Sequence, residues 1–195
     1  MPVISFANTK GGTGKTTSAV FLAAALSYRG IRPLVVDADP QGSASAWIYG
    51  ASQASGQDLC DLVAANAQTL TRLPRDRWCV VDTGPGNPAI VDEAVAVADL
   101  VVIPTAPSLG DLERVWQTLK ITQGTPTGVL LTQVNPQATL TKDVRAALEE
   151  DGVAVFPTPI LRRESFRQRF GQWPEAGRGL VGYDDVLDSI QEGLS

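Results

Sequence analysis

Short runs of consecutive apolar residues alternate with longer amphipathic segments along this chain. Five runs are predicted to be strands, and they lie at residues 2–7, 34–36, 79–81, 100–103 and 129–131. Their apolar residues are continuous rather than alternating, which is typical of parallel strands covered on both faces. The segments between and after them are predicted to be helices, at residues 16–28, 59–67, 89–97, 109–122, 141–150, 164–170 and 184–192. This alternation predicts one α/β domain over residues 1–195, with a mostly parallel, doubly wound sheet and helices on both faces. The small and polar residues 50–56 are predicted to form a surface loop.

The segment K-G-G-T-G-K-T-T at residues 10–17, here called the phosphate loop, connects the first predicted strand to the first predicted helix. Glycines permit left-handed backbone and close approach, so successive N–H groups can turn inward around phosphate oxygens at a helix N-terminus. In this pattern Lys15 reaches the β- and γ-phosphates, and the Thr16 hydroxyl binds Mg²⁺. The alternative, a glycine-rich turn with two solvated lysines, is disfavoured by the flanking strand and helix. The residues predicted to contact the nucleotide here are Gly11, Gly12, Thr13, Gly14, Lys15, Thr16 and Thr17.

Lys10 stands out because the phosphate cradle does not require it. The pattern G-x-x-x-x-G-K-[ST] places its first glycine at Thr9 and accepts any residue at the position of Lys10. A second cation at the entrance of the loop must therefore neutralise some other charge.

Aspartates follow two further predicted strands. Asp37 and Asp39 end the second strand, and Asp82 ends the third, followed by Gly86. Ligands of open α/β sheets bind beyond the carboxyl ends of the strands, so these acids are expected beside the phosphate loop. One of the first pair is expected to face Mg²⁺ through water and the other to orient the attacking water, while Asp82 is a second Mg²⁺ partner and Gly86 offers an N–H to the γ-phosphate. For each acid taken alone, a strand-end carboxylate that caps the next turn is the alternative.

Composition excludes several classes of protein. The chain has 195 residues, of which 44% are hydrophobic and 19% charged, as in ordinary globular proteins. It contains no histidine, which excludes histidine ligation of metals and histidine acid–base chemistry. Cys60 and Cys79 are expected to be reduced, buried thiols of a cytosolic protein. No apolar run approaches the ~20 residues of a membrane span.

Positive charge gathers in one segment of an acidic chain. The net charge is −5, yet residues 162–178 hold five arginines and only two acids, so the rest of the chain carries −8. Such a segment is suited to present a local basic face. The candidates for contacts with the backbone of nonspecific DNA are Arg162, Arg163, Arg167 and Arg169, and a solvated helix face is the alternative.

The motifs K-G-G-T-G-K-T, V-V-D-A-D-P-Q-G and V-V-D-T-G-P-G together resemble, in order and spacing, the ParA/MinD ATPases with a deviant Walker A motif. The D-A-D-P-Q element is similar to the ParA branch, and a phosphate loop beginning at residue 10 is similar to small plasmid-partition proteins without an N-terminal DNA-binding domain. The resemblance implies a P-loop NTPase fold, ATP and Mg²⁺ as cofactors, and an ATP-sandwich homodimer. It also implies slow hydrolysis stimulated by a ParB-type adaptor, ATP-dependent binding to nonspecific DNA, and a cytoplasmic, nucleoid-associated protein.

The resemblance assigns roles to individual residues. Lys10 matches the signature lysine that reaches the partner's nucleotide, and Lys15 and Thr16 match the phosphate and Mg²⁺ residues. Asp39 matches the water-positioning acid, Asp37 its neighbour at the metal, and Asp82 the Walker B acid. Asn135, in T-Q-V-N-P at residues 132–136, matches the residue that contacts adenine, although Asn-Pro is also a common turn signal. The catalytic set is therefore Lys10, Lys15 and Asp39.

Other branches of the same fold fit the sequence less well. A membrane-bound relative needs a basic amphipathic tail, whereas residues 183–192 are acidic. Cys60 and Cys79 do not match the pattern of an iron–sulfur reductase, and amidotransferase relatives carry an additional domain. The cargo, whether a plasmid, a chromosome region, a protein compartment or an envelope machine, stays open. So does an ATP-dependent metabolic or metal-insertion role without DNA.

Overall fold

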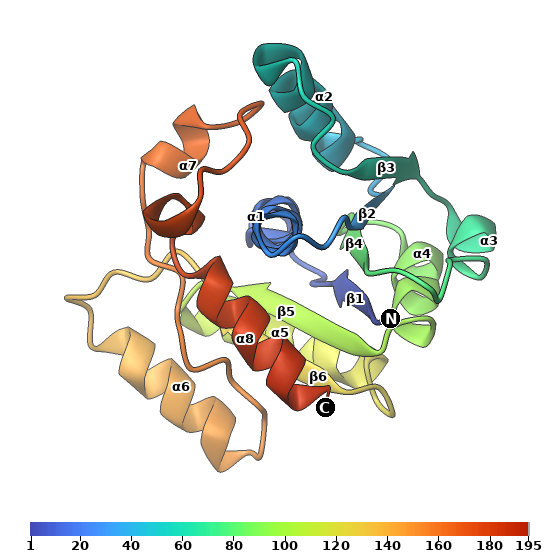
Figure 1. Ribbon diagram of the computed structural model, residues 1–195. Coiled ribbons are helices and arrows are strands. Elements are labelled where there is room, and N and C mark those ends of the chain that lie inside the picture. The colour runs from blue at the N-terminus through green and yellow to red at the C-terminus, as the bar shows by residue number, and fades with distance from the viewer. Residues whose placement is uncertain (195) are drawn as a thin grey trace.

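The computed structural model describes residues 1–194, apart from the side chains of Ser165 and Arg167. The described residues form a six-stranded sheet in the order β3-β2-β4-β1-β5-β6, and every neighbouring pair is parallel (Figure 1). The strands are β1 (Val3–Phe6), β2 (Leu34–Ala38), β3 (Asp61–Ala64), β4 (Cys79–Thr83), β5 (Leu100–Thr105) and β6 (Thr127–Leu131). The parallel sheet and the five strands expected from continuous apolar runs are confirmed.

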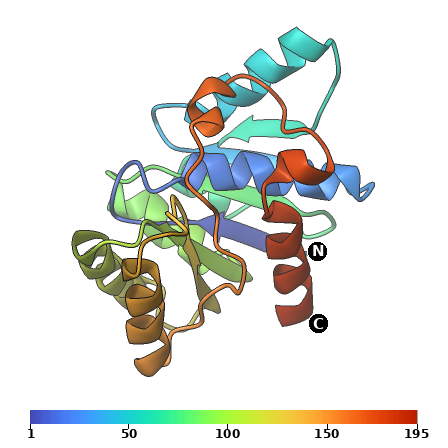
Figure 2. The same cartoon turned by 90° about the vertical axis from the view of Figure 1, so that its left-hand side faces the viewer.

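Helices cover both faces of the sheet (Figures 1 and 2). One apolar core joins α1, α2 and α8 to one face, and two others join α4 and α5 to the opposite face. Helix α1 is buried along most of its length because α2 and α8 pack against its outer side. The helices are α1 (Lys15–Tyr28), α2 (Ser43–Ser55), α3 (Ala67–Leu70), α4 (Pro88–Ala96), α5 (Leu109–Ile121), α6 (Leu140–Glu150), α7 (Ser165–Gln168) and α8 (Tyr183–Gly193), with a 3₁₀ turn η1 (Gly177–Leu180).

The helix predicted at residues 59–67 is wrong, because this segment holds the edge strand β3. Strand β3 pairs in parallel with β2, with Leu34 opposite Asp61 and Val36 opposite Val63. An edge strand is covered on one side only, so β3 is half exposed and lacks the continuous apolar run of the inner strands. The short helix α3 begins only after Asn66, whose side chain and that of Thr69 cap its N-terminus reciprocally.

The surface loop predicted at residues 50–56 is also wrong, because most of it belongs to helix α2. Four serines and Gly50 lower the helix propensity of this segment, which its four alanines offset only in part. Burial of Trp47 and Ile48 against the core supplies what propensity lacks. Gly50 has a packing reason inside the helix, since a Cβ there would lie 3.1 Å from Cα of Gly171.

The expectation of two buried, free thiols is also met. Cys60 and Cys79 are free and buried, and burial raises the pKa of both thiols, that of Cys60 to about 12. Such thiols are inert at neutral pH. Among the described residues, the helices are too short or too polar to cross a bilayer.

Candidate functional site

The phosphate loop leaves β1 at the centre of the sheet and leads directly into α1. Gly12 and Gly14 have left-handed backbone, with φ of 74° and 98°, and Gly14 caps the N-terminus of α1. Asn8 fixes the entrance of the loop: its side chain is buried, donates to the carbonyl of Pro104 at 2.8 Å and accepts from the N–H of Lys10 at 2.9 Å. This is the strand, glycine loop and helix arrangement that binds phosphate.

The two lysines of the loop have opposite environments. Lys15 is buried, and its Nζ donates to the carbonyl oxygen of Lys10 at 2.9 Å. Burial lowers the pKa of Lys15, while the charges of Asp82 and Asp39 oppose that shift. The side chain of Lys10 is 45% exposed and forms an ion pair of 2.8 Å with Asp111, which is 7% exposed. Asp111 also bonds to Ser108, the N-cap of α5.

The strand-end acids meet as the topology requires. Strand β4 lies between β1 and β2, and its register places Asp82 opposite both Asp37 and Phe6, the last residue of β1. Asp82 is fully buried, and neither carboxylate oxygen has a hydrogen-bond partner among the described residues. Burial raises the pKa of Asp82 to about 7; the Thr16 hydroxyl and Lys15 oppose the shift, and Asp37 adds to it.

The other two acids are held by backbone groups. Asp37 accepts from the N–H of Ser45 at 2.7 Å and from that of Asp39 at 3.2 Å, so it caps the first turn of α2. This is the strand-end capping considered above as the alternative, and it occupies both oxygens of Asp37. Asp39 accepts from the N–H of Gln41 at 2.9 Å and lines the cavity described next.

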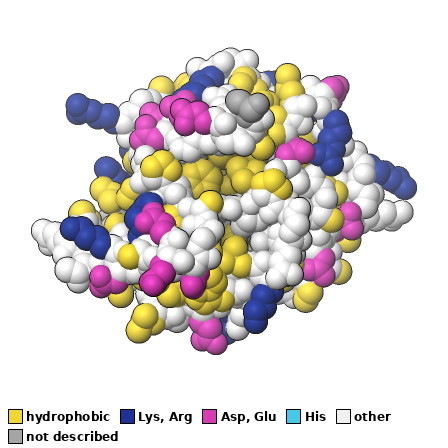
Figure 3. All heavy atoms as spheres, turned by 90° about the horizontal axis from the view of Figure 1, so that it is seen from below, with side chains coloured by type: hydrophobic (Ala, Val, Ile, Leu, Met, Phe, Trp, Pro, Cys, Tyr) yellow, Lys and Arg dark blue, Asp and Glu magenta, His cyan; other side chains and the backbone are white. Residues whose placement is uncertain are grey.

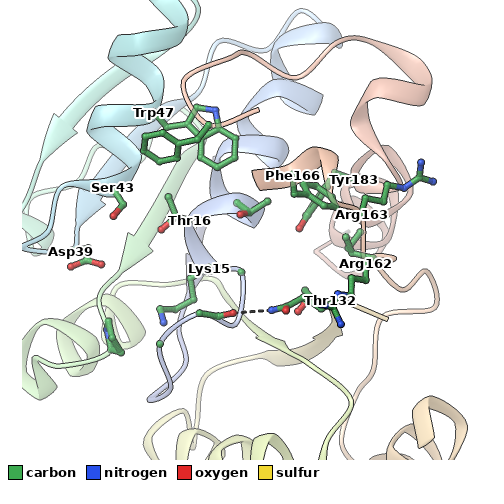
Figure 4. Close-up of a pocket in the computed structure, with 18 of the residues that line it drawn as sticks. Lys15, Thr16, Asp39, Ser43, Trp47, Thr132, Arg162, Arg163, Phe166 and Tyr183 are labelled. Carbon is green, nitrogen blue, oxygen red and sulfur yellow. Dashed lines mark hydrogen bonds between the residues drawn. The ribbon is translucent and has the colours of Figure 1, made fainter. Parts of the chain in front are cut away.

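A cavity of about 830 Å³ opens beside the phosphate loop (Figure 4). One end is polar, formed by the loop together with Asp39, Gln41 and Ser43. The other end is aromatic, and here Figure 4 shows Trp47, Phe166 and Tyr183 from three different elements. A volume of this size holds a nucleotide-sized ligand. The lining residues are Gly11, Gly12, Gly14, Lys15, Thr16, Thr17, Asp39, Gln41, Ser43, Trp47, Pro85, Thr132, Gln133, Ile160, Leu161, Arg162, Arg163, Glu164, Phe166, Phe170 and Tyr183.

Not every predicted site residue reaches this cavity. Gly86 and Asn135 are exposed and lie outside its lining, and the Asn135 carboxamide oxygen accepts from the N–H of Gln137 at 3.1 Å. Thr132 and Gln133, from the same segment as Asn135, instead contact the phosphate loop. The Thr132 hydroxyl donates to the carbonyl of Thr13, and the Gln133 amide donates to that of Gly12, each at 2.8 Å. The sequence did not predict this contact, because a threonine and a glutamine after a strand do not indicate which loop they will bind.

The arginine-dense segment contributes to the rim of the cavity. Arg162 and Arg163 are exposed and line the cavity rim, where Figure 4 shows Arg163 pointing away from the phosphate loop. Arg169 is half-buried, and its guanidinium donates to the carbonyl of Gly179 at 3.4 Å. The side chain of Arg167 lies outside the described residues. Of the four predicted arginines, two therefore stand free at the rim.

Two named relatives cover most of the chain. Both are called maintenance of carboxysome distribution protein A. The protein from Gloeobacter kilaueensis is 40% identical over 161 residues, which span 79% of this chain and 74% of the relative. The protein from Halothiobacillus neapolitanus is 30% identical over 205 aligned residues, which span 97% of this chain and 94% of the relative.

Solved structures share the whole fold. A protein from Borrelia burgdorferi assigned to plasmid partition, crystallised with AMPPNP, superposes with a TM-score of 0.81 at 19% identity, covering 98% of this chain and 99% of that one. Cobyrinic acid a,c-diamide synthase from Mycobacterium smegmatis with ADP and magnesium superposes with a TM-score of 0.75 at 21% identity, covering 98% and 94%. At such identities the likeness concerns the fold alone.

The sequence model of one family matches residues 4–172, from the first strand to the segment after α7. That range contains the phosphate loop, the three strand-end acids and the cavity rim. The chain belongs to the CobQ/CobB/MinD/ParA nucleotide-binding domain family.

Proposed function

We propose that this chain is a ParA-like positioning ATPase that binds ATP and Mg²⁺, dimerises through the bound nucleotides and hydrolyses ATP slowly. The observation that carries the proposal is the opposite placement of two lysines on one loop. Lys15 lies inside the cavity, where it offsets phosphate charge, whereas Lys10 is half exposed and outside the cavity lining. In a dimer, a cation placed outside its own cavity can reach the nucleotide of the second subunit while it stays close to Asp111. The relatives named for carboxysome distribution support a positioning role.

The residues around Asp82 fit a bound Mg²⁺. Asp82 presents two buried oxygens without a partner among the described residues, and the neighbouring Thr16 hydroxyl lines the cavity. Hard oxygen ligands of this kind suit Mg²⁺, which also keeps several waters. Asp37 would act through such a water, since backbone N–H groups already bind its oxygens. Bound Mg²⁺ supplies neutralisation of the phosphate charge.

Asp39 is the residue proposed to position the attacking water. It lines the cavity at the phosphate end, and the N–H of Gln41 fixes one of its oxygens. Phosphoryl transfer to water needs little more from the protein than positioning and charge stabilisation. A carboxylate held in this way supplies the positioning of the water. Lys15, together with Lys10 of the partner subunit, supplies the stabilisation of charge.

Binding to nonspecific DNA is proposed for the dimer. Arg162 and Arg163 give one subunit only a small basic rim on an acidic body. Two such rims on one particle make the second contact intramolecular, which raises affinity by orders of magnitude. ATP-controlled dimerisation thus becomes a switch for DNA binding and nucleoid association. A ParB-type adaptor is proposed as the partner on the cargo side, and the cargo is a plasmid, a chromosome region or a protein compartment.

Nucleotide binding should depend on Lys15 and not on Lys10. Lys15→Ala removes the only ammonium group that lines the described cavity, so we expect ADP and ATP binding to be lost in a folded protein. Lys10→Ala removes the same charge from the same loop and is the matched control: it should still bind ADP but fail to dimerise with ATP or hydrolyse it. Calorimetry, light scattering and phosphate release measure the three properties. Wild-type ADP affinity in Lys15→Ala contradicts the site, and normal hydrolysis by Lys10→Ala contradicts its role between subunits.

The buried carboxyl of Asp82 should make stability depend on pH in the absence of Mg²⁺ and nucleotide. Its folded pKa of about 7 exceeds the ordinary unfolded value, so the protonated carboxyl favours folding at low pH, and this contribution is lost as the pH rises through 7. We expect Asp82→Asn to gain stability over wild type by about 2–3 kcal/mol between pH 5 and pH 8. Denaturant titrations at several pH values measure the difference.

A matched control for Asp82→Asn is Asp188→Asn. Asp188 is exposed, and its hydrogen bond to Arg29 lowers its pKa, so it is ionised in both states throughout this range. Its effect on stability should not change between pH 5 and pH 8. A pH-independent difference for Asp82→Asn as well shows that its carboxylate is not desolvated.

Gly84→Ala should mimic the loss of Asp39. A Cβ at Gly84 would lie 2.7 Å from Oδ1 of Asp39, so the carboxylate must move. Misplacing a catalytic group by about 1 Å can cost ~100-fold, and we expect turnover to fall by about 10–100-fold while ADP affinity is kept. Gly86→Ala is the control, because its Cβ meets nothing within 4 Å and its N–H is retained. Wild-type turnover in Gly84→Ala would show that hydrolysis does not need Asp39 where it stands.

DNA binding should depend on the arginines at the cavity rim. We expect the wild-type protein to bind random-sequence duplex with ATP and not with ADP, and the affinity to fall steeply with salt. Arg162→Glu/Arg163→Glu should abolish it while hydrolysis is retained. Arg72→Glu/Lys142→Glu, which makes the same change of charge at two exposed sites, is the control. Fluorescence anisotropy at low salt measures binding of each variant to the duplex. If the wild-type protein does not bind with ATP and Mg²⁺, the result favours a metabolic ATPase of the same fold.

A further inference from the structure

The end of β6 holds two carbonyl groups of the phosphate loop. The buried Thr132 hydroxyl donates to the carbonyl of Thr13, and the Gln133 side-chain amide donates to the carbonyl of Gly12. Both distances are 2.8 Å, and Figure 4 marks the bond to Gly12 as a dashed line beside Thr132. Thr132 and Gln133, about 120 positions further along the chain, therefore hold two adjacent peptide groups of the phosphate loop by hydrogen bonds from one side.

These two hydrogen bonds determine the direction in which two N–H groups of the phosphate loop point. In a planar trans peptide, the carbonyl of one residue and the N–H of the next point in opposite directions. Binding the carbonyls of Gly12 and Thr13 therefore turns the N–H groups of Thr13 and Gly14 away from the end of β6. Within residues 1–194 these two N–H groups donate to no protein acceptor. They are the free donors that an anion in the loop requires.

The backbone conformation of Gln133 indicates that its side chain does more than complete the turn after β6. Its φ is 54°, in the left-handed region, where a glycine is at ease and a side chain is strained. Gln133 is also exposed, so burial does not explain a long side chain here. Strained backbone of this kind persists at sites where the surrounding contacts over-determine it. The contact that Gln133 makes is the hydrogen bond from its side-chain amide to the carbonyl of Gly12.

We infer that Thr132 and Gln133 are positioning residues for the phosphate chain, which hold the loop so that the N–H groups of Thr13 and Gly14 receive it. Neither residue needs to touch the nucleotide. The segment between β6 and α6, expected to contact the base through Asn135, acts through these two residues on the phosphates. The site consequently selects ligands by their phosphate chain. This inference rests on the proposed binding of ATP.

Three variants separate positioning from folding. Thr132→Val keeps the shape and removes the donor, and Thr132→Ser restores it. Gln133→Gly removes the donor and also relieves the left-handed backbone, so the melting temperature should stay the same or rise while ADP affinity falls. Thr132→Val and Gln133→Gly each remove one hydrogen bond that orients a loop peptide. We expect each variant to bind ADP about tenfold more weakly. Thr132→Ser should stay within about threefold of wild type.

Calorimetry with ADP and competition by tripolyphosphate, which has no base, are the measurements. Gln137→Met, compared with Gln133→Met, is the matched control, since Gln137 is exposed on the same segment and does not touch the phosphate loop. Equal loss of ADP and tripolyphosphate affinity in the donor variants, with the melting temperature of Gln133→Gly retained, supports the inference. Unchanged ADP affinity overturns it, and so does loss of ADP affinity with normal tripolyphosphate affinity, which assigns the segment to the base. If wild type binds neither ligand, the proposed function itself fails.

Discussion

The parallel pairing of β4 with β1 on one side and β2 on the other is the constraint on which the whole site depends. Its register places Asp82 opposite Phe6 and Asp37, so two acids and the phosphate loop emerge at the same edge of the sheet. In a parallel sheet all carboxyl ends lie at that edge, and the helices that follow begin there. Groups far apart in the sequence meet because backbone hydrogen bonds fix the strands.

The cost of this arrangement is a buried acid. The Asp82 carboxylate oxygens have no hydrogen-bond partner among the described residues, and burial is the largest cause of the raised pKa of Asp82. Isolated charges of this kind are expensive, and proteins retain them where a ligand or metal completes the site. Lys15 shows the complementary shift, since burial lowers its pKa. Burial disfavours the charged form of both groups, and a phosphate chain with a divalent cation would relieve both together.

Local signals in the sequence predicted the inner strands, the phosphate loop and the strand-end acids, because each depends on a short run of residues. They did not predict β3, whose four residues become a strand only through pairing with β2, nor α2, whose turns are rich in serine and alanine and are held in the core by Trp47. Contacts between distant segments gave no local signal at all. Arg162 reaches the cavity rim because its N–H bonds to the carbonyl of Val134, 28 residues earlier, and Thr132 reaches the phosphate loop through the sheet.

The two lysines show how one loop can separate two tasks. Lys15 donates to the carbonyl of Lys10, so the peptide that carries Lys10 is held by the residue that faces the cavity. The side chain of Lys10 turns the other way, to Asp111 at the start of α5. Because Asp111 is buried, it keeps a strong preference for a cation, whereas Lys10 itself remains partly in water. Lys10 has three donors, so in the proposed dimer a phosphate of the partner subunit could bind it without replacing Asp111. In that dimer the loop would join binding within one subunit to contact between subunits through a single peptide group.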